Sequence, residues 1–498
     1  MANQMNNLCK CPFCFKPFAP DAVHFKTETV VDQAYIDAAD LPEEEEEKLK
    51  MYLSKPDEKY NTFWSQYGGA PQGSDDGTPS YWNEYYNHAV IGFVGSEFEQ
   101  NKPQQGLRDE SGFLYGAVDS MNKPTKIRVC PHCHNPLPHE YGKYPVKFVS
   151  VVGITSSGKT VYLSQLLSRI NEFLARANLT IVGMHNEIDD FVREHRIAKN
   201  KELPKGNSKH TLTLPLPMNV KDNITGNTFT MIFYDIAGEN CVDPDQMEKY
   251  GKFIENANGI VMIVDPKQFS DLFTSLNDAP LQAYDDESDE DEDEDDDFYD
   301  EDEEDDFDEE EYEEIERPER VVQAMYNAFA SRSAGGRSSI PLAVAVSKSD
   351  LIQNYFRNSD MHMFHNIDYS SYDRMGFPKN DFYNIDSEVR SVLSGMRMRK
   401  ESMQGKLLCD QLKQNFEKHA FFAVSAVYNA SIIKKRRKKT GDIILTVQSS
   451  PDTLRVEEPI LWLLYEMGLV REANIKTADS RKNDGRNGGK PLRRRLFG

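Results

Sequence analysis

The hydrophobic and polar residues alternate in a way that predicts buried strands separated by helices. Short apolar runs bounded by turn residues are typical of buried strands, and apolar residues three and four apart are typical of amphipathic helices. Helical spacing runs from Val161 to Leu174 and recurs over 187–198 and near Arg320. The predicted strands are 148–152, 211–216, 229–234, 259–264, 341–346 and 421–424. This succession predicts an α/β domain with a mostly parallel sheet and one antiparallel edge strand.

The antiparallel part of the sheet is predicted from a hairpin pattern. The strands 211–216 and 229–234 flank the turn-rich segment 219–227, which reads NVKDNITGN. Because proline cannot donate a ladder hydrogen bond, Pro215 and Pro217 place the first of these strands at a sheet edge.

A glycine-rich loop follows the first predicted strand. Residues 153–160 read GITSSGKT and match G-x-x-x-x-G-K-[ST], in the order strand, loop, helix that gives this pattern meaning. Backbone N–H groups of such a loop converge on one spot, and the helix dipole adds positive potential there. A chance match in an ordinary strand-turn-helix is the alternative. The predicted nucleotide contacts are Gly153, Thr155, Ser156, Ser157, Gly158, Lys159 and Thr160.

Two side chains of this loop have separate expected roles. Lys159 can place its ammonium on the β and γ phosphates, and the Thr160 hydroxyl can ligate Mg²⁺. A second Mg²⁺ ligand is Thr211, for which an ordinary strand threonine is the alternative.

The strand 229–234 runs into a second motif, D-I-A-G-E. A carboxylate in the place of Asp235 holds Mg²⁺, usually through water. Gly238 can give its N–H to a γ-phosphate with no side chain in the way, and Glu239 follows it. The motif is weak alone, but its position after a hairpin and downstream of the glycine-rich loop makes it specific.

The last two predicted strands end in residues suited to a guanine base. The strand 341–346 is followed by S-K-S-D, in which the Asp350 carboxylate can accept from guanine N1–H and the exocyclic amine. Adenine offers a mismatched edge, so this carboxylate favours GTP over ATP. Lys348 can pack its stem over the base, and Ser347 opens the loop. Backbone N–H groups of Ser425 and Ala426, after the final strand, can contact the guanine oxygen.

Two near copies of C-P-x-C predict a metal site. Cys11 and Cys14 form the first pair, and Cys130 and Cys133 form the second, each followed by a polar and proline turn. Two such knuckles supply four thiolates in a tetrahedron, which is the closed, structural zinc site, and these soft ligands favour Zn²⁺ over Mg²⁺. The 115 residues between the pairs exceed ordinary ribbon spacing, so 22–124 is interpreted as an insertion.

Alternatives to this site remain open in the sequence. The two pairs can be unrelated C-x-x-C turns with redox activity. Other side chains that can replace a cysteine ligand are Cys9, His132, His134 and His139. Within the insertion, 41–55 is charged and predicts a short helix. The stretch 61–86 is rich in aromatic residues, which can bind a partner or simply pack against the ribbon.

The negative charge of the chain is concentrated in one segment. The net charge is −24, but 285–316 holds 26 acidic residues and no Lys or Arg, and without them the net charge would be +2. Such a segment cannot bury enough apolar surface to fold, so it is expected to be disordered. It can serve as a solvated spacer, or it can act in autoinhibition by neutralising the basic run Lys434–Lys439. The tail 471–498 is also basic and expected to be disordered. Either basic run can contact nucleic acid or an anionic membrane, although neither carries interleaved aromatics.

Cysteine use and hydropathy bear on the compartment. No apolar run reaches the roughly eighteen residues that a transmembrane helix needs, and the first residues lack a hydrophobic signal core. Seven cysteines, four of them in two pairs, indicate metal binding in a reducing compartment. A cytoplasmic location is therefore expected.

The motifs in this order, each at a strand end, resemble the TRAFAC-class GTPases that include Ras-like switches. The resemblance covers roughly 146–470 and implies a three-layer P-loop domain that binds GTP or GDP with Mg²⁺. The split zinc ribbon and the sequence RVEEPILWLLYEMGLV at 455–470 are similar to a narrower group, the double-GTPase proteins of predicted bacterial conflict systems. That similarity implies work with partner proteins in a defence-type or regulatory complex. The expected domains are a split ribbon over 1–145, a GTPase domain over 146–470 and a disordered tail.

Two positions depart from the family pattern. Ser347 stands where the family has Asn or Thr, and Glu239 stands where Ras-like enzymes place Gln. A carboxylate can orient or deprotonate water, but it adds negative charge near the γ-phosphate, so slow hydrolysis is expected, with Lys159 and Glu239 as the catalytic residues. The expected function is a GTPase switch acting on partner proteins. The alternatives are a P-loop ATPase and a non-hydrolysing, nucleotide-bound zinc-ribbon scaffold.

Overall fold

The fold is described from a computed structural model. The described residues are 8–26, 37, 42–50, 57–68, 90–92, 106–118, 124–153, 157–184, 186–197, 202–204, 214–237, 240, 244–273, 276, 281–284, 317–330, 336–356, 360–372, 375–398, 402–437 and 443–476.

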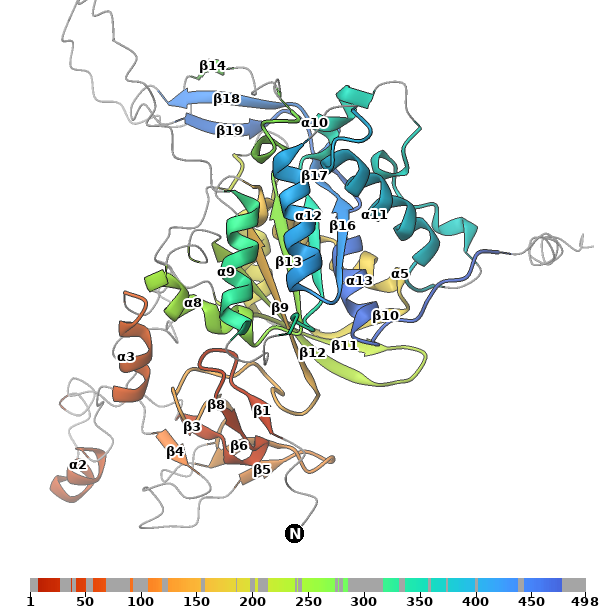
Figure 1. The fold of residues 1–498 in the computed structure, drawn as a ribbon. Helices are drawn as coiled ribbons and strands as arrows, with labels where there is room; N and C mark the ends of the chain where they lie inside the picture. The colour runs from red at the N-terminus through yellow and green to blue at the C-terminus, as the bar shows by residue number, and fades with distance from the viewer. Residues whose placement is uncertain are drawn as a thin grey trace, which may run out of the picture. The chain divides into compact units, whose positions relative to one another are not determined.

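A central sheet is the main feature of the molecule (Figure 1). Over the described ranges it has seven strands in the order β10-β11-β12-β9-β13-β15-β16. Strands β13 and β15 are buried along their whole length, as expected for a sheet covered on both faces. Strand β15 runs parallel to β16, and the predicted α/β class is confirmed. The strand bounds are β9 (Val146–Gly153), β10 (Leu179–Met184), β11 (Leu216–Asp222), β12 (Thr228–Ala237), β13 (Gly259–Val264), β15 (Leu342–Val346) and β16 (His419–Ala423).

Helices follow most of these strands, as the sequence pattern predicts. In Figure 1, α9 and α12 lie side by side, α11 packs against β16 and α13 packs against β15. Helix α13 is apolar on every side from Pro459 to Leu464, which fits its buried position. The helix bounds are α4 (Lys159–Ser168), α5 (Ile170–Arg176), α6 (Asn186–His195), α8 (Pro244–Glu255), α9 (Pro318–Ala330), α10 (Ser349–Gln353), α11 (Lys379–Leu393), α12 (Met403–Asn415) and α13 (Glu458–Glu466).

The predicted hairpin is present, but its first strand was placed wrongly. Strand β11 begins at Leu216, five residues later than expected, and the turn is confined to 223–227. The strand is antiparallel to β10 and β12 and lies between them, so it is not at a sheet edge. The apolar run 179–184 supplies the extra strand outside it. Pro217, opposite Ile232, sits near the strand's start, where a missing N–H disturbs the ladder least.

The chain divides into two compact units, each described by itself. Unit 1 is Met1–Val151, Asn178–Phe191 and Asn207–Ile260, and unit 2 is Val152–Ala177, Val192–Gly206 and Val261–Gly498. Unit 2 also holds a three-stranded sheet of β14 (Leu281–Tyr284), β18 (Ile432–Arg437) and β19 (Ile443–Val447). In addition, β17 (Ser425–Tyr428) pairs with β20 (Asp452–Leu454).

Unit 1 begins with a module of short strands around the cysteines. Strand β3 pairs with β8 and with β4, so two strands within the predicted insertion 22–124 share one sheet with β8, which follows it. The charged stretch near residue 45 forms α2, as predicted. The bounds are β1 (Cys9–Lys10), β2 (Pro17–Phe18), β3 (His24–Lys26), β4 (Val90–Gly92), β5 (Gly106–Arg108), β6 (Leu114–Val118), β7 (Pro124–Thr125), β8 (Ile127–Val129), α2 (Glu43–Lys50) and α3 (Glu58–Ser65).

Some predicted features lie outside the described residues. They are Thr155, Ser156, Thr211, Gly238, Glu239, the acidic segment 285–316 and most of the basic tail. The start of that tail is described: the N–H of Ala473 donates to the Phe377 carbonyl at 2.8 Å. The N–H of Lys476 donates to the Ser371 carbonyl at 2.9 Å, so residues 471–476, assigned to the tail from the sequence, pack against 371–377. Every helix in the described ranges is too short or too polar to span a membrane.

Candidate nucleotide and zinc sites

The glycine-rich loop closes tightly between β9 and α4. A Cβ atom on Gly153 would lie 2.6 Å from Ser157 Oγ and 3.1 Å from Lys159 Cβ, so only glycine fits there. Gly158 has φ +82°, the left-handed conformation that glycine adopts at no steric cost, and it directly precedes α4. The two glycines of the motif therefore allow a turn that larger residues would prevent.

The amino end of α4 is suited to an anion. The N-cap residue Gly158 makes no side-chain hydrogen bond to the first turn, and the amino end of a helix carries positive potential that favours an anion. The Ser157 hydroxyl is buried and has no hydrogen-bond partner among the described residues. Lys159 and Thr160, in the first turn, are also buried, at 8% and 6% exposure. A buried polar atom without a hydrogen-bond partner destabilises a protein, so such an atom is expected where a ligand supplies the partner.

The S-K-S-D loop is bound to this glycine-rich loop within unit 2. The Ser347 hydroxyl donates to the Ser157 carbonyl at 2.8 Å, and its oxygen lies 3.1 Å from the Val264 carbonyl. Lys348 has φ +49°, and its stem passes Gly158, since a Cβ on that glycine would lie 3.9 Å from Lys348 Cε. The structure thus brings the predicted phosphate and base motifs together.

The Lys348 ammonium forms an ion pair with Asp265, a residue that the sequence analysis missed. Asp265 directly follows β13, is 4% exposed and caps the short helix at 266–268. Its signal in the sequence was the same as that of Asp235, an acidic residue at the carboxyl end of a buried strand.

Asp350 and Ser425 meet at the other side of the base loop. Burial raises the pKa of the Asp350 carboxyl, and a hydrogen bond with the Ser425 side chain, which lowers this pKa, opposes the shift. The Ser349 N–H donates to the Val424 carbonyl at 3.1 Å, which ties α10 to the end of β16. Ala426 follows in β17. The S-K-S-D and S-A motifs, predicted separately, are therefore neighbours.

The D-x-x-G motif belongs to unit 1. Asp235 lies near the end of β12 and is 4% exposed. Asn240, five residues on, is 3% exposed, and its side-chain oxygen has no hydrogen-bond partner in the described part of the chain. Sequence reasoning missed Asn240, although a polar amide two residues after the motif glycine was available as a signal.

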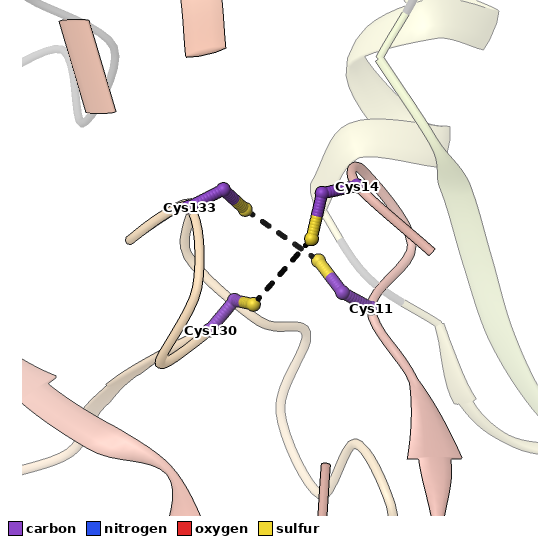
Figure 2. Close-up of side chains that lie close together, drawn as sticks. All are labelled: Cys11, Cys14, Cys130 and Cys133. Atoms are coloured by element: carbon purple, nitrogen blue, oxygen red, sulfur yellow. Dashed lines mark hydrogen bonds between the residues drawn. The ribbon is translucent and has the colours of Figure 1, made fainter. Parts of the chain in front are cut away.

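The four paired cysteines lie together in unit 1 (Figure 2). The sulfurs of Cys11 and Cys133 are 3.7 Å apart, and those of Cys14 and Cys130 are 3.8 Å apart. Sulfurs placed about 2.3 Å from a tetrahedral Zn²⁺ are about 3.8 Å from one another, so the spacing fits the ion without rearrangement. The backbone N–H of Phe13 points at the Cys11 sulfur at 3.3 Å, as expected for a thiolate ligand. The predicted four-cysteine zinc site is supported.

The other proposed ligands have different partners. His134 Nδ1 lies 2.8 Å from Asp57 Oδ1, and His134 Nε2 lies 3.2 Å from His24 Nδ1. The Cys9 thiol donates to the Phe18 carbonyl at 3.5 Å. Asp57 also caps α3 through the Tyr60 N–H. These contacts position the knuckles and the insertion helix α3, and they leave ligation to the four paired cysteines.

The aromatic stretch of the insertion is used for packing where the structure describes it. Trp64 is 2% exposed, and its Nε1 donates to the Asn135 side chain at 2.8 Å. Asn135 Nδ2 in turn donates to the Cys133 sulfur at 3.3 Å. Trp64 therefore holds α3 against the second knuckle. The remaining aromatic residues of the stretch 61–86, which lie at 81–86, fall outside the described ranges.

The mixed α/β sheet, the uncapped phosphate-type loop and the base-type loop bound to it define a GTPase-like P-loop domain. Residues 150–355 match the family model described as Double-GTPase 1.

Solved structures with some likeness include the GTPase-like domain of S. cerevisiae Ski7 bound to GTP, at 12% identity and TM-score 0.23, covering 57% of this chain and 43% of that chain. The same domain bound to GDP and inorganic phosphate gives 12% identity and TM-score 0.21, covering 57% and 44%. This chain thus spans less than half the length of either structure. No curated protein matches it.

Proposed function

We propose that this protein binds GTP with Mg²⁺ and hydrolyses it slowly to GDP and phosphate. The observation that carries the proposal is the hydrogen bond of Ser347 to the Ser157 carbonyl, which holds the S-K-S-D loop on the glycine-rich loop. A single ligand with a phosphate chain and a base would use both loops. The neighbouring Asp350 and Ser425 support guanine as that base.

The residues have the following proposed roles. The positive amino end of α4 and the Lys159 ammonium stabilise phosphate charge. Thr160 and Asp235 would hold Mg²⁺, since hydroxyl and carboxylate oxygens are among its preferred ligands. The ion supplies charge neutralisation on the phosphates when bound.

The loops near Thr211 and Gly238 are proposed to order on the γ-phosphate and so report the nucleotide state. Glu239 orients the attacking water, and Asn240 is a second polar group beside it in the sequence. A carboxylate close to γ-phosphate adds repulsion, so turnover is slow and an arginine of a partner protein accelerates it. Work in a defence-type complex follows from the family resemblance, and the unpaired thiols favour a reducing, cytoplasmic location.

The base assignment is tested by measuring dissociation constants for GTP, ATP and XTP with wild type and two variants. Asp350→Ala should abolish the preference for GTP over ATP. Asp350→Asn should prefer XTP, because its amide can donate to the 2-oxo group of xanthine. Asp360→Asn, at an exposed aspartate, is the matched control and should behave as wild type. Retention of the GTP preference in Asp350→Ala would refute base recognition by Asp350, and a preference of wild type for ATP would favour the ATPase alternative.

Hydrolysis is tested separately by single-turnover phosphate release. Wild type with Mg²⁺ should release phosphate, and Asp235→Asn should release it more slowly at saturating nucleotide. Normal GTP affinity without phosphate release, with or without partner proteins, would leave a nucleotide-bound scaffold as the correct interpretation.

A further inference from the structure

Tyr234 connects the first zinc knuckle to the strand that carries Asp235. Its hydroxyl donates to the Pro12 carbonyl at 2.7 Å, and Pro12 lies between the ligands Cys11 and Cys14. Tyr234 is 1% exposed. Because successive side chains of a strand point to opposite faces, Tyr234 faces the knuckle while Asp235 faces the other side of β12.

Phe15 makes a second connection from the same knuckle. It follows Cys14 and has φ +56°, a conformation rare for a bulky residue, so packing must hold it there. Its ring centroid lies 5.9 Å from that of Tyr234 and 5.1 Å from that of Phe253, both in edge-on contacts. Phe253 belongs to α8, the helix that follows D-x-x-G. The knuckle therefore contacts the elements on both sides of that motif.

The insertion helix α3 and the turn after it make a further contact with α8. The Lys252 ammonium lies 5.1 Å from the centre of the Phe63 ring and 5.0 Å from that of Tyr67. The Tyr67 hydroxyl donates to the Lys249 carbonyl at 3.2 Å. Cation–π contacts of a partly desolvated lysine stabilise such an arrangement. Helix α8 is thus fixed to the N-terminal module by two aromatic contacts within unit 1.

The segment entering β11 also borders the knuckle. Phe13, between the ligands, lines a small cavity with Leu214 and Pro215, which follow Thr211 closely in the chain. Both loops that the proposed function assigns to γ-phosphate sensing are therefore adjacent in sequence to residues that contact the zinc module.

We infer that Tyr234 and Phe15 are positioning residues that link zinc occupancy to the nucleotide state. Zinc fixes the knuckle, the knuckle fixes the end of β12 and α8, and these in turn set the position of the Mg²⁺ and γ-phosphate groups. Linkage is reciprocal, so a bound triphosphate must tighten zinc binding by the same factor by which zinc tightens triphosphate binding. With an unchanged rate of zinc association, this tighter binding is observed as slower zinc release. This inference rests on the proposed GTP binding.

The test measures zinc release from the full chain into a chromogenic chelator, with no nucleotide, with GDP or with a slowly hydrolysed GTP analogue, all with Mg²⁺. In wild type the GTP analogue should slow release by about fivefold or more relative to GDP, the lower end of ordinary coupling energies. In Tyr234→Phe and in Phe15→Leu this ratio should fall below about twofold, because the connection is weakened.

Tyr141→Phe is the matched control. Tyr141 is also a buried tyrosine, but its hydroxyl donates to the Lys10 carbonyl before the first knuckle rather than to a residue between the zinc ligands. This variant should release zinc faster than wild type in every state while keeping the wild-type ratio between nucleotides. A Tyr234→Phe ratio equal to that of Tyr141→Phe would overturn the inference.

Bound nucleotide is measured in the same samples with a fluorescent analogue, which separates the two possible failures. If nucleotide binds and the zinc release of wild type does not depend on it, the coupling is refuted and the proposed function stands. If no guanine nucleotide binds, the proposed function is refuted, and the coupling with it.

Discussion

The Ser347 hydroxyl donates a 2.8 Å hydrogen bond to the backbone carbonyl of Ser157, which lies 190 residues earlier in the chain. Ser347 stands where related GTPases have Asn or Thr, a departure that puts the rigidity of the base loop in question. The bond shows that serine can hold the base loop on the phosphate loop. The geometry of the two loops depends on this contact and on the backbone bond from Ser347 N–H to Val264.

Removing this hydroxyl should weaken nucleotide binding. Ser347→Ala loses one buried hydrogen bond, worth about 1 kcal/mol, so the dissociation constant for GTP should rise by about fivefold. Ser347→Thr keeps the hydroxyl and should stay close to wild type. Titration of both variants with a fluorescent GTP analogue checks this, and equal affinities of Ser347→Ala and wild type would contradict it.

A methyl group at Gly153 should block the phosphate loop. The added Cβ would lie 2.6 Å from Ser157 Oγ, closer than real atoms approach, so the loop must shift. Overpacking costs about 1–3 kcal/mol, and GTP affinity should fall by about tenfold or more. Gly336→Ala is the control, because its new Cβ meets nothing within 4 Å. The same loss in both variants, or in neither, would speak against a closely packed loop.

The zinc content should depend on the paired cysteines alone. Wild type should hold about one zinc per chain, and Cys130→Ser should hold almost none, because a structural site needs all four ligands. Cys409→Ser, at a free cysteine of α12, should retain the metal. Elemental analysis of the purified variants measures this. Loss of zinc in Cys409→Ser, or its retention in Cys130→Ser, would show that the ligands are assigned wrongly.

The buried Lys26 should make stability depend on alkaline pH. Burial lowers the pKa of Lys26 to about 8, although the ion pair with Asp57 at 3.2 Å acts to raise it. Between pH 8 and the ordinary lysine value, the unfolded chain holds a proton that the folded chain has released. The free energy of unfolding therefore rises with pH across this window, by the linkage relation.

The measurement compares wild type with Lys26→Met in denaturant at pH 8 and pH 10. The free energy of unfolding of wild type minus that of Lys26→Met should be larger at pH 10 than at pH 8, because the other lysines contribute equally to both proteins. A decrease would mean that the Lys26 ammonium is stabilised rather than destabilised in the folded protein.

The sequence predicted strands and helices well where periodicity was strong. Strand 259–264 was predicted with its observed bounds, because six apolar residues between turn residues have few alternatives. The hairpin strand β11 was misplaced, because prolines at 215 and 217 and an apolar run at 211–216 gave conflicting signals. Only the pairing with β10 shows that the strand is internal. Asp265 was missed because no motif marks a residue whose partner, here Lys348, lies far away in the chain.

The sequence by itself determined the two knuckles, the glycine-rich loop and the residue types suited to phosphate, magnesium and guanine. These follow from local spacing, since a tight turn and a helix start depend on a few consecutive residues. Only the tertiary structure decided that Ser347 bonds to Ser157 and that Tyr234 bonds to the first knuckle. These contacts join residues that are 190 and 222 positions apart, and they depend on how strands are ordered in a sheet, which local patterns do not specify.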